Sequence, residues 1–142
     1  MKFSDRYPLI VTPQKNACRD FWAKYLGFNV GFDSDWFVWL TAEDGSASIA
    51  FMTPDHPSAP PGPKVFPGEG MCFELQVESA QAAFDEMKAL NAPIALALTT
   101  EPFGQKRFGF SDPSGLWIDV VEQVESAVGY WDKYMTQAVK AG

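Results

Sequence analysis

The sequence is poor in the residues on which most metal and redox sites depend. Its 142 residues include one histidine, His56, and two cysteines, Cys18 and Cys72, which lie far apart. No Cys-x-x-Cys or Cys-x-x-His spacing occurs, so the sequence supports neither a disulfide framework nor a structural zinc cluster. We therefore expect a protein that folds around an apolar core in a reducing compartment.

Basic residues and long apolar runs are scarce as well. The chain has 11 Lys and Arg against 18 Asp and Glu, which is a formal net charge of -7. Nucleic-acid-binding proteins collect Lys and Arg against phosphate, so we expect no nucleic-acid partner and no anionic membrane. No apolar run approaches the roughly 20 residues of a membrane span, and residues 1–6 lack the apolar stretch of a signal peptide. The expected location is the cytoplasm.

Motifs of phosphate binding and of serine hydrolases are missing too. The sequence contains no GxxxxGK[ST], no GxGxxG and no GxSxG. A Ser-His-Asp triad would need His56, which lies in a proline-rich stretch that is a poor place to hold a base rigidly. These reaction classes therefore have no sequence support.

What the chain does contain is 46% hydrophobic residues, 15% aromatic residues, and 11 each of Gly and Pro. A single domain of this length buries roughly two thirds of its unfolded surface, and the composition is typical of short strands joined by turns. The pattern predicts a helix that begins at Thr12-Pro13 and ends at Gly27. Strands are expected before it, over 7–11, and after it, over 28–32, 36–41 and 48–52.

The second half of the chain repeats this order after a proline-rich linker over residues 54–70. A strand, a helix capped by Ser79 and three further strands are expected, and Leu26-Gly27-Phe28 corresponds to Leu90-Asn91-Ala92 at a shift of about 64 residues. The strands are predicted over 71–77, 94–98, 105–110 and 116–122. An amphipathic helix over about 126–140 is expected to cover a sheet edge or a partner subunit.

Two motifs accompany the repeat: Phe21-Trp22-x-x-Tyr25-Leu26-Gly27-Phe28 and Asp112-Pro113-Ser114-Gly115. With the paired modules, they resemble the vicinal oxygen chelate superfamily of glyoxalases, bleomycin-resistance proteins and extradiol dioxygenases, over residues 5–123. The resemblance implies an α+β fold of two βαβββ modules, about 5–53 and 71–123, that form a cup-shaped half-barrel in a single domain, plus the C-terminal helix. It also implies a homodimer, with modules paired within one chain or swapped between two.

Metal-dependent members of that superfamily hold a divalent ion at three strand positions. The corresponding residues of this chain are Tyr7, Cys72 and Asp119. A phenol, one thiol and one carboxylate suit neither hard nor borderline cations well. We therefore expect no cofactor, and a divalent metal remains the disfavoured alternative.

The cup should be lined by side chains that alternate along the strands. The expected ligand-binding residues are Tyr7, Trp36, Trp39, Cys72, Glu74, Gln76, Arg107, Trp117 and Asp119. Alternative roles stay open: the aromatic rings and Cys72 as ordinary core, Asp119 tied to backbone or to Arg107, Arg107 bound to a ligand or to an acid. For Glu74 and Gln76 the alternative is a solvated open sheet face.

Three functions are consistent with these residues. The first is a metal-independent protein, similar to bleomycin-resistance proteins, that sequesters an aromatic or cationic small organic ligand in an aromatic, acidic cup. The second is a glyoxalase-like lyase or isomerase in which Glu74 and Asp119 are catalytic, with or without a divalent metal. The third is an interaction domain with a collapsed cup, in which the C-terminal helix makes the dimer.

Overall fold

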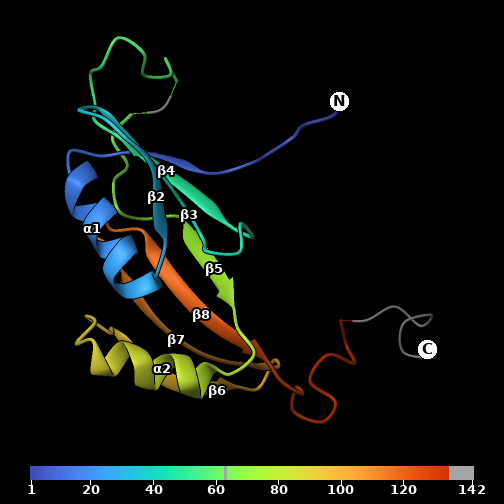
Figure 1. The fold of residues 1–142 in the computed structure, drawn as a ribbon. Coiled ribbons are helices and arrows are strands. Elements are labelled where there is room, and N and C mark those ends of the chain that lie inside the picture. The colour runs from blue at the N-terminus through green and yellow to red at the C-terminus, as the bar shows by residue number, and fades with distance from the viewer. Residues whose placement is uncertain (63, 135–142) are drawn as a thin grey trace. The chain divides into compact units, whose positions relative to one another are not determined.

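The computed structural model describes residues 1–62 and 64–134. It divides the chain into two compact units, one formed by residues 1–71 with 111–117 and the other by residues 72–110 with the described residues from 118 on. Each contains one helix and a four-stranded sheet, with α1 against the first sheet and α2 against the second (Figure 1). The predicted α+β fold with two βαβββ repeats is confirmed.

The first unit has the sheet order β1-β4-β3-β2, with β1 parallel to β4 and the other pairs antiparallel. Its elements are β1 (Leu9–Val11), α1 (Lys15–Leu26), β2 (Asn29–Asp33), β3 (Phe37–Thr41) and β4 (Ser48–Met52). Helix α1 begins later than predicted, at Lys15, and the Thr12 hydroxyl accepts a hydrogen bond from the Gln14 N–H at 3.1 Å. It ends as predicted at Gly27, whose φ of 68° is left-handed.

The first core lies between α1 and its sheet. The Trp22 ring is fully buried, 5.0 Å from the Phe28 ring centroid and 6.2 Å from that of Phe51. On β3 the residues Val38 and Leu40 are buried against the helix, whereas their neighbours along the strand are half-buried. The period of two thus leaves alternate residues of β3 on the open face of the sheet.

The connection over residues 111–117 owes its shape to one buried carboxylate. Asp112 is 4% exposed and accepts hydrogen bonds from the Trp22 indole N–H at 2.9 Å and from the Ser114 hydroxyl at 2.6 Å. The Ser114 and Leu116 backbone N–H groups donate to the same carboxylate. Gly115, with a φ of 89°, lies so close to Gly68 that a Cβ would be 2.6 Å from the Gly68 Cα. The Asp-Pro-Ser-Gly motif therefore has a structural role in the first unit.

The second unit has the sheet order β5-β8-β7-β6. Its elements are β5 (Cys72–Gln76), α2 (Ala80–Ala89), β6 (Leu96–Glu101), β7 (Gln105–Ser111) and β8 (Trp117–Gln123). The predicted cap of α2 is confirmed, because the Ser79 hydroxyl accepts a hydrogen bond from the Ala82 N–H at 3.1 Å. Phe84 of α2 packs against Phe108 of β7 with ring centroids 5.3 Å apart. The face of this sheet opposite α2 is the open face.

The expected C-terminal helix is wrong over its described part. Residues 128–134 form successive turns, in which backbone N–H groups donate to carbonyls three residues back. Gly129 has a φ of 76°, which is incompatible with a right-handed helix at that point. Residues 135–140 of the predicted helix lie outside the described residues. Among the residues that the structure describes, no helix has the length and apolar character needed to cross a membrane.

We expect Asp112→Ala to lower the free energy of unfolding by about 3 kcal/mol, because it leaves several buried donors without an acceptor. Urea unfolding of wild type and variant measures the difference. Asp35→Ala removes an exposed carboxylate of the same unit and should change stability by less than about 0.5 kcal/mol. Equal unfolding midpoints for both variants would contradict the structural role of Asp112.

Candidate ligand-binding site

The open face of the second sheet carries the predicted polar residues of β5. Cys72, Glu74 and Gln76 are exposed, whereas Phe73 and Leu75 between them are half-buried. This alternation is the one predicted from the sequence. It contradicts the alternative in which Cys72 is a buried apolar residue; the buried cysteine of the chain is Cys18, whose pKa is raised to about 12, chiefly by burial.

Arg107 joins two carboxylates on this face. Its Nη1 lies 3.1 Å from Oδ2 of Asp119 on β8, and its Nε lies 3.4 Å from Oε1 of Glu101 on β6. The Asp119 side chain is only 4% exposed, so its charge needs such a partner. The two carboxylates outweigh the effect of burial and raise the pKa of Arg107. The structure therefore pairs Arg107 with acids, one of the two roles that the sequence left open.

Glu74 is the third carboxylate of this group. Partial loss of hydration raises its pKa, and so do the negative charge of Asp119 and a hydrogen bond with Asp119, while Arg107 acts in the opposite direction. We call Glu74, Glu101, Arg107 and Asp119 the acid–arginine cluster. When all four are ionised, three negative charges stand against one positive charge. A cation placed beside Glu74 would offset this excess.

The neighbouring positions are uncharged. The Gln76 amide oxygen accepts a hydrogen bond from the Gln123 amide at 3.3 Å, which links β5 and β8 beside the cluster. Trp117, at the start of β8, is half-buried. Of the predicted ligand-binding residues, the second unit thus brings Glu74, Arg107 and Asp119 into contact, with Gln76 and Cys72 along the same strand as Glu74.

The other predicted aromatic residues belong to the first unit. Tyr7, 47% exposed, lies with its ring centroid 6.4 Å from that of half-buried Trp39 in an edge-to-face arrangement. The Trp39 ring crosses β2 at Gly31, where a Cβ would be 2.4 Å from the indole. Its Nε1 is the one buried side-chain nitrogen or oxygen for which the described residues offer no hydrogen-bond partner.

Trp36 has an occupied ring face. The imidazole of His56 stacks on it with centroids 4.1 Å apart and an interplanar angle of 6°. His56 is held in turn by the Ser58 backbone N–H, which donates to Nδ1 at 3.0 Å. A flat ligand could stack on this face of Trp36 only after displacing His56. The sequence singled out His56 for its rarity and contained no signal of this contact.

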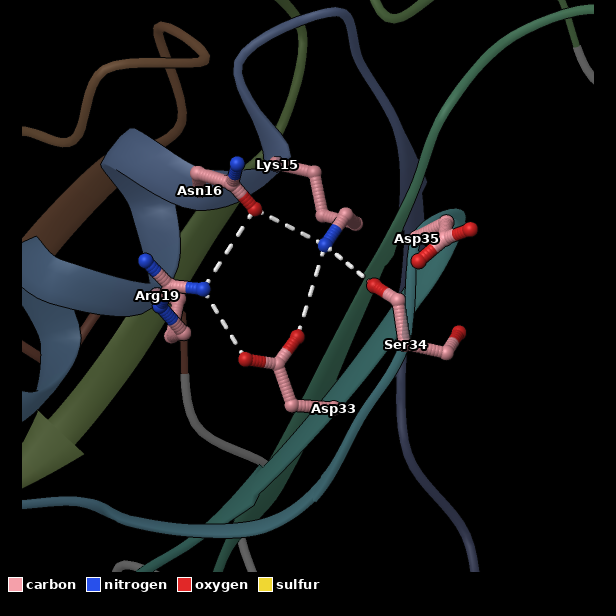
Figure 2. A pocket seen from close by; sticks show the side chains of 6 residues that line it. All are labelled: Lys15, Asn16, Arg19, Asp33, Ser34 and Asp35. Atoms are coloured by element: carbon pink, nitrogen blue, oxygen red, sulfur yellow. Dashed lines mark hydrogen bonds and ion pairs between the residues drawn. The ribbon is translucent and has the colours of Figure 1, made fainter.

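A polar pocket of about 340 Å³ lies at the first turn of α1 and was not predicted (Figure 2). Lys15, with 4% of its side chain exposed, donates to the Ser34 carbonyl at 2.7 Å and lies 3.4 Å from Asp33. Arg19 lies 2.9 Å from the other oxygen of Asp33. Burial acts to raise the pKa of Asp33, but the hydrogen bonds from Arg19 and Lys15 lower it. These cations already have acceptors within the chain, so the pocket offers little to a ligand.

The residues do not fit the metal of the metal-dependent proteins that the sequence resembles. Asp119, the one carboxylate at the three corresponding positions, is already paired with the positively charged guanidinium of Arg107. Within residues 1–62 and 64–134, no three His, Cys, Asp or Glu side chains are grouped to hold a metal ion. A phenol and an exposed thiol do not compensate for the missing oxygen and imidazole ligands.

Comparisons with known proteins agree with this fold. A sequence model of the Glyoxalase/Bleomycin resistance protein/Dioxygenase superfamily matches residues 7–120. A glyoxalase/bleomycin resistance protein/dioxygenase from Nocardioides is similar, with a TM-score of 0.72 and 14% identity over 88% of this chain and 86% of that chain. A lactoylglutathione lyase from Agrobacterium tumefaciens has a TM-score of 0.67 and 16% identity, over 84% and 92% of the two chains.

An integron cassette protein from the mobile metagenome of V. cholerae has a TM-score of 0.68 and 18% identity, over 86% of this chain and 97% of that chain. No curated protein matches the sequence. At such low identities the structural likeness establishes the fold, and a fold of this kind carries many unrelated functions.

We expect Glu74→Gln to stabilise the protein near neutral pH and to lose this advantage in acid. Because folding raises the pKa of Glu74, the stability of the wild type falls as the pH rises from the unfolded to the folded pKa. Urea unfolding at steps from about pH 4 to pH 8 should show that the difference in the free energy of unfolding between variant and wild type grows as the pH rises. The matched variant Glu86→Gln, on the exposed surface of α2, controls for the loss of one carboxylate. A pH-independent difference for Glu74→Gln would contradict the assignment.

Proposed function

The chain belongs to the Glyoxalase/Bleomycin resistance protein/Dioxygenase superfamily, and we propose that it binds a small organic cation without a metal ion. The observation that carries this proposal is the excess of negative charge in the acid–arginine cluster. Arg107 is engaged by Glu101 and Asp119, so the group holds a third carboxylate, Glu74, whose ionisation a bound cation would favour.

The position of Glu74 suits this role. It lies on the open face of β5, exposed to solvent, whereas Asp119 beside it is buried and held by Arg107. A ligand can therefore reach the Glu74 carboxylate without breaking the ion pairs of Arg107. The formal net charge of -7 adds a long-range attraction for basic compounds.

Binding of a cation should depend on Glu74 and on pH. We expect Glu74→Gln to weaken the binding of N-methylquinolinium about fivefold, as removal of one partly screened charge would do. The affinity of the wild type should rise with pH across the titration of Glu74, because the cation binds the ionised form. Isothermal titration calorimetry at two pH values and two salt concentrations measures both effects.

The neutral compound 1-methylnaphthalene, which has the same shape as N-methylquinolinium, is the ligand control, and Glu86→Gln is the matched protein control. Equal affinity of the wild type for the charged and the neutral compound would contradict a cation site. So would an equal loss of affinity in Glu74→Gln and Glu86→Gln.

A second candidate function is acid–base catalysis, which the raised pKa of Glu74 beside Asp119 favours. The similar protein named a lactoylglutathione lyase suggests the substrate to try, the hemithioacetal of methylglyoxal and glutathione. If the chain is such an isomerase, Glu74→Gln should lower turnover at least about a hundredfold while the protein stays folded.

The rate is followed by ultraviolet absorbance with and without added divalent metal ions, and Glu86→Gln should keep the wild-type rate. Absence of turnover by the wild type under all of these conditions, or an unchanged rate in Glu74→Gln, would exclude this reaction for Glu74.

A further inference from the structure

Four aromatic rings gather where the C-terminal turns meet the connection between β6 and β7. The Tyr130 ring centroid is 6.5 Å from that of Phe103, 5.0 Å from that of Trp131 and 6.4 Å from that of Tyr134. Trp131 and Tyr134 are 5.8 Å apart. We call Phe103, Tyr130, Trp131 and Tyr134 the aromatic turn cluster.

Backbone and side-chain hydrogen bonds hold this cluster in place. The Trp131 indole N–H donates to the Phe103 carbonyl at 2.8 Å, and the Ala127 N–H donates to the Pro102 carbonyl at 2.8 Å. The Val124 N–H donates to the Gly104 carbonyl at 2.9 Å. A side chain at Gly104 would not fit, since its Cβ would be 2.9 Å from the Val124 carbonyl oxygen. The rings are therefore positioned by the second unit itself.

Much of this positioned ring surface remains exposed. Trp131 is 37% exposed and Tyr134 is 63% exposed, whereas Tyr130 is half-buried. Ordered aromatic faces that remain in water attract flat apolar groups and cations. The cluster thus has the chemistry that the acid–arginine cluster lacks.

Arg107 connects the two clusters. Its guanidinium carbon lies 5.6 Å from the Phe103 ring centroid, and its Nη1 lies 3.1 Å from Asp119, the neighbour of Glu74. The positive charge of Arg107 is balanced by Asp119 and Glu101, so it does not repel a cation as a free guanidinium would. Arg107 therefore contacts a carboxylate of one cluster and a ring of the other.

From this arrangement we infer that Phe103 and Tyr130 form the aromatic wall of the cation site, with Trp131 holding Phe103 in position. The inference rests on the proposed function and deepens it, because it names the class of ligand. That class is a flat aromatic cation whose charge is directed toward Glu74 and whose ring lies against the wall. Aliphatic cations would use the carboxylates alone.

Three probes distinguish the contribution of the aromatic wall to binding from that of the carboxylates. They are N-methylquinolinium, tetramethylammonium and 1-methylnaphthalene. Their dissociation constants are measured by calorimetry and by quenching of tryptophan fluorescence. Tyr130→Leu should weaken the binding of the two aromatic probes about fivefold and change that of tetramethylammonium less than twofold. Tyr130→Phe keeps the ring and should restore wild-type affinity.

Phe32→Leu removes another exposed ring, from β2, and should change none of the three affinities. An equal loss for aromatic and aliphatic probes in Tyr130→Leu, or no loss for either aromatic probe, would overturn the wall. If Tyr130→Leu weakens the binding of the aromatic probes but Glu74→Gln changes no affinity, the aromatic wall is supported and the cation site is overturned. Failure of the wild type to bind any probe would overturn both.

Discussion

The ion pair between Arg107 and Asp119 is the constraint on which the candidate site depends. Asp119 is buried within β8, and a buried carboxylate without a partner would cost several kcal/mol. The guanidinium of Arg107 meets this need with an ion pair of 3.1 Å. It also joins Glu101 on β6 to the face and lies over the ring of Phe103. One side chain thus sets both the charge and the neighbours of the site.

The raised pKa of Glu74 depends on this arrangement. Partial loss of hydration raises its pKa, and the negative charge of the neighbouring Asp119 adds to this effect. The open face of the second sheet leaves Glu74 exposed to solvent. The two proposed functions, binding of a cation and proton transfer, both depend on this carboxylate.

Much of the second sheet could be predicted from the sequence, because a strand places alternate side chains on opposite faces. That rule put Glu74 and Gln76 on the open face, and it also exposes Cys72, against the statistical expectation for a lone cysteine. The prediction of a C-terminal helix was wrong, in part because of the conformation of a single residue. Its apolar residues have helical spacing, but Gly129 adopts a left-handed conformation. Backbone N–H groups just before it donate hydrogen bonds to the carbonyls of Pro102 and Gly104.

The sequence by itself determined the repeat, the helix ends at Gly27 and Ser79, and the polar face of β5, since these follow from periodicity and from the conformations that single residues allow. Tertiary structure decided the partners. Arg107 reaches Asp119 twelve residues away, His56 stacks on Trp36, and Trp131 bonds to Phe103 across 28 residues. Such contacts depend on how turns and sheets bring distant segments together, and no local sequence pattern specifies which distant residues meet.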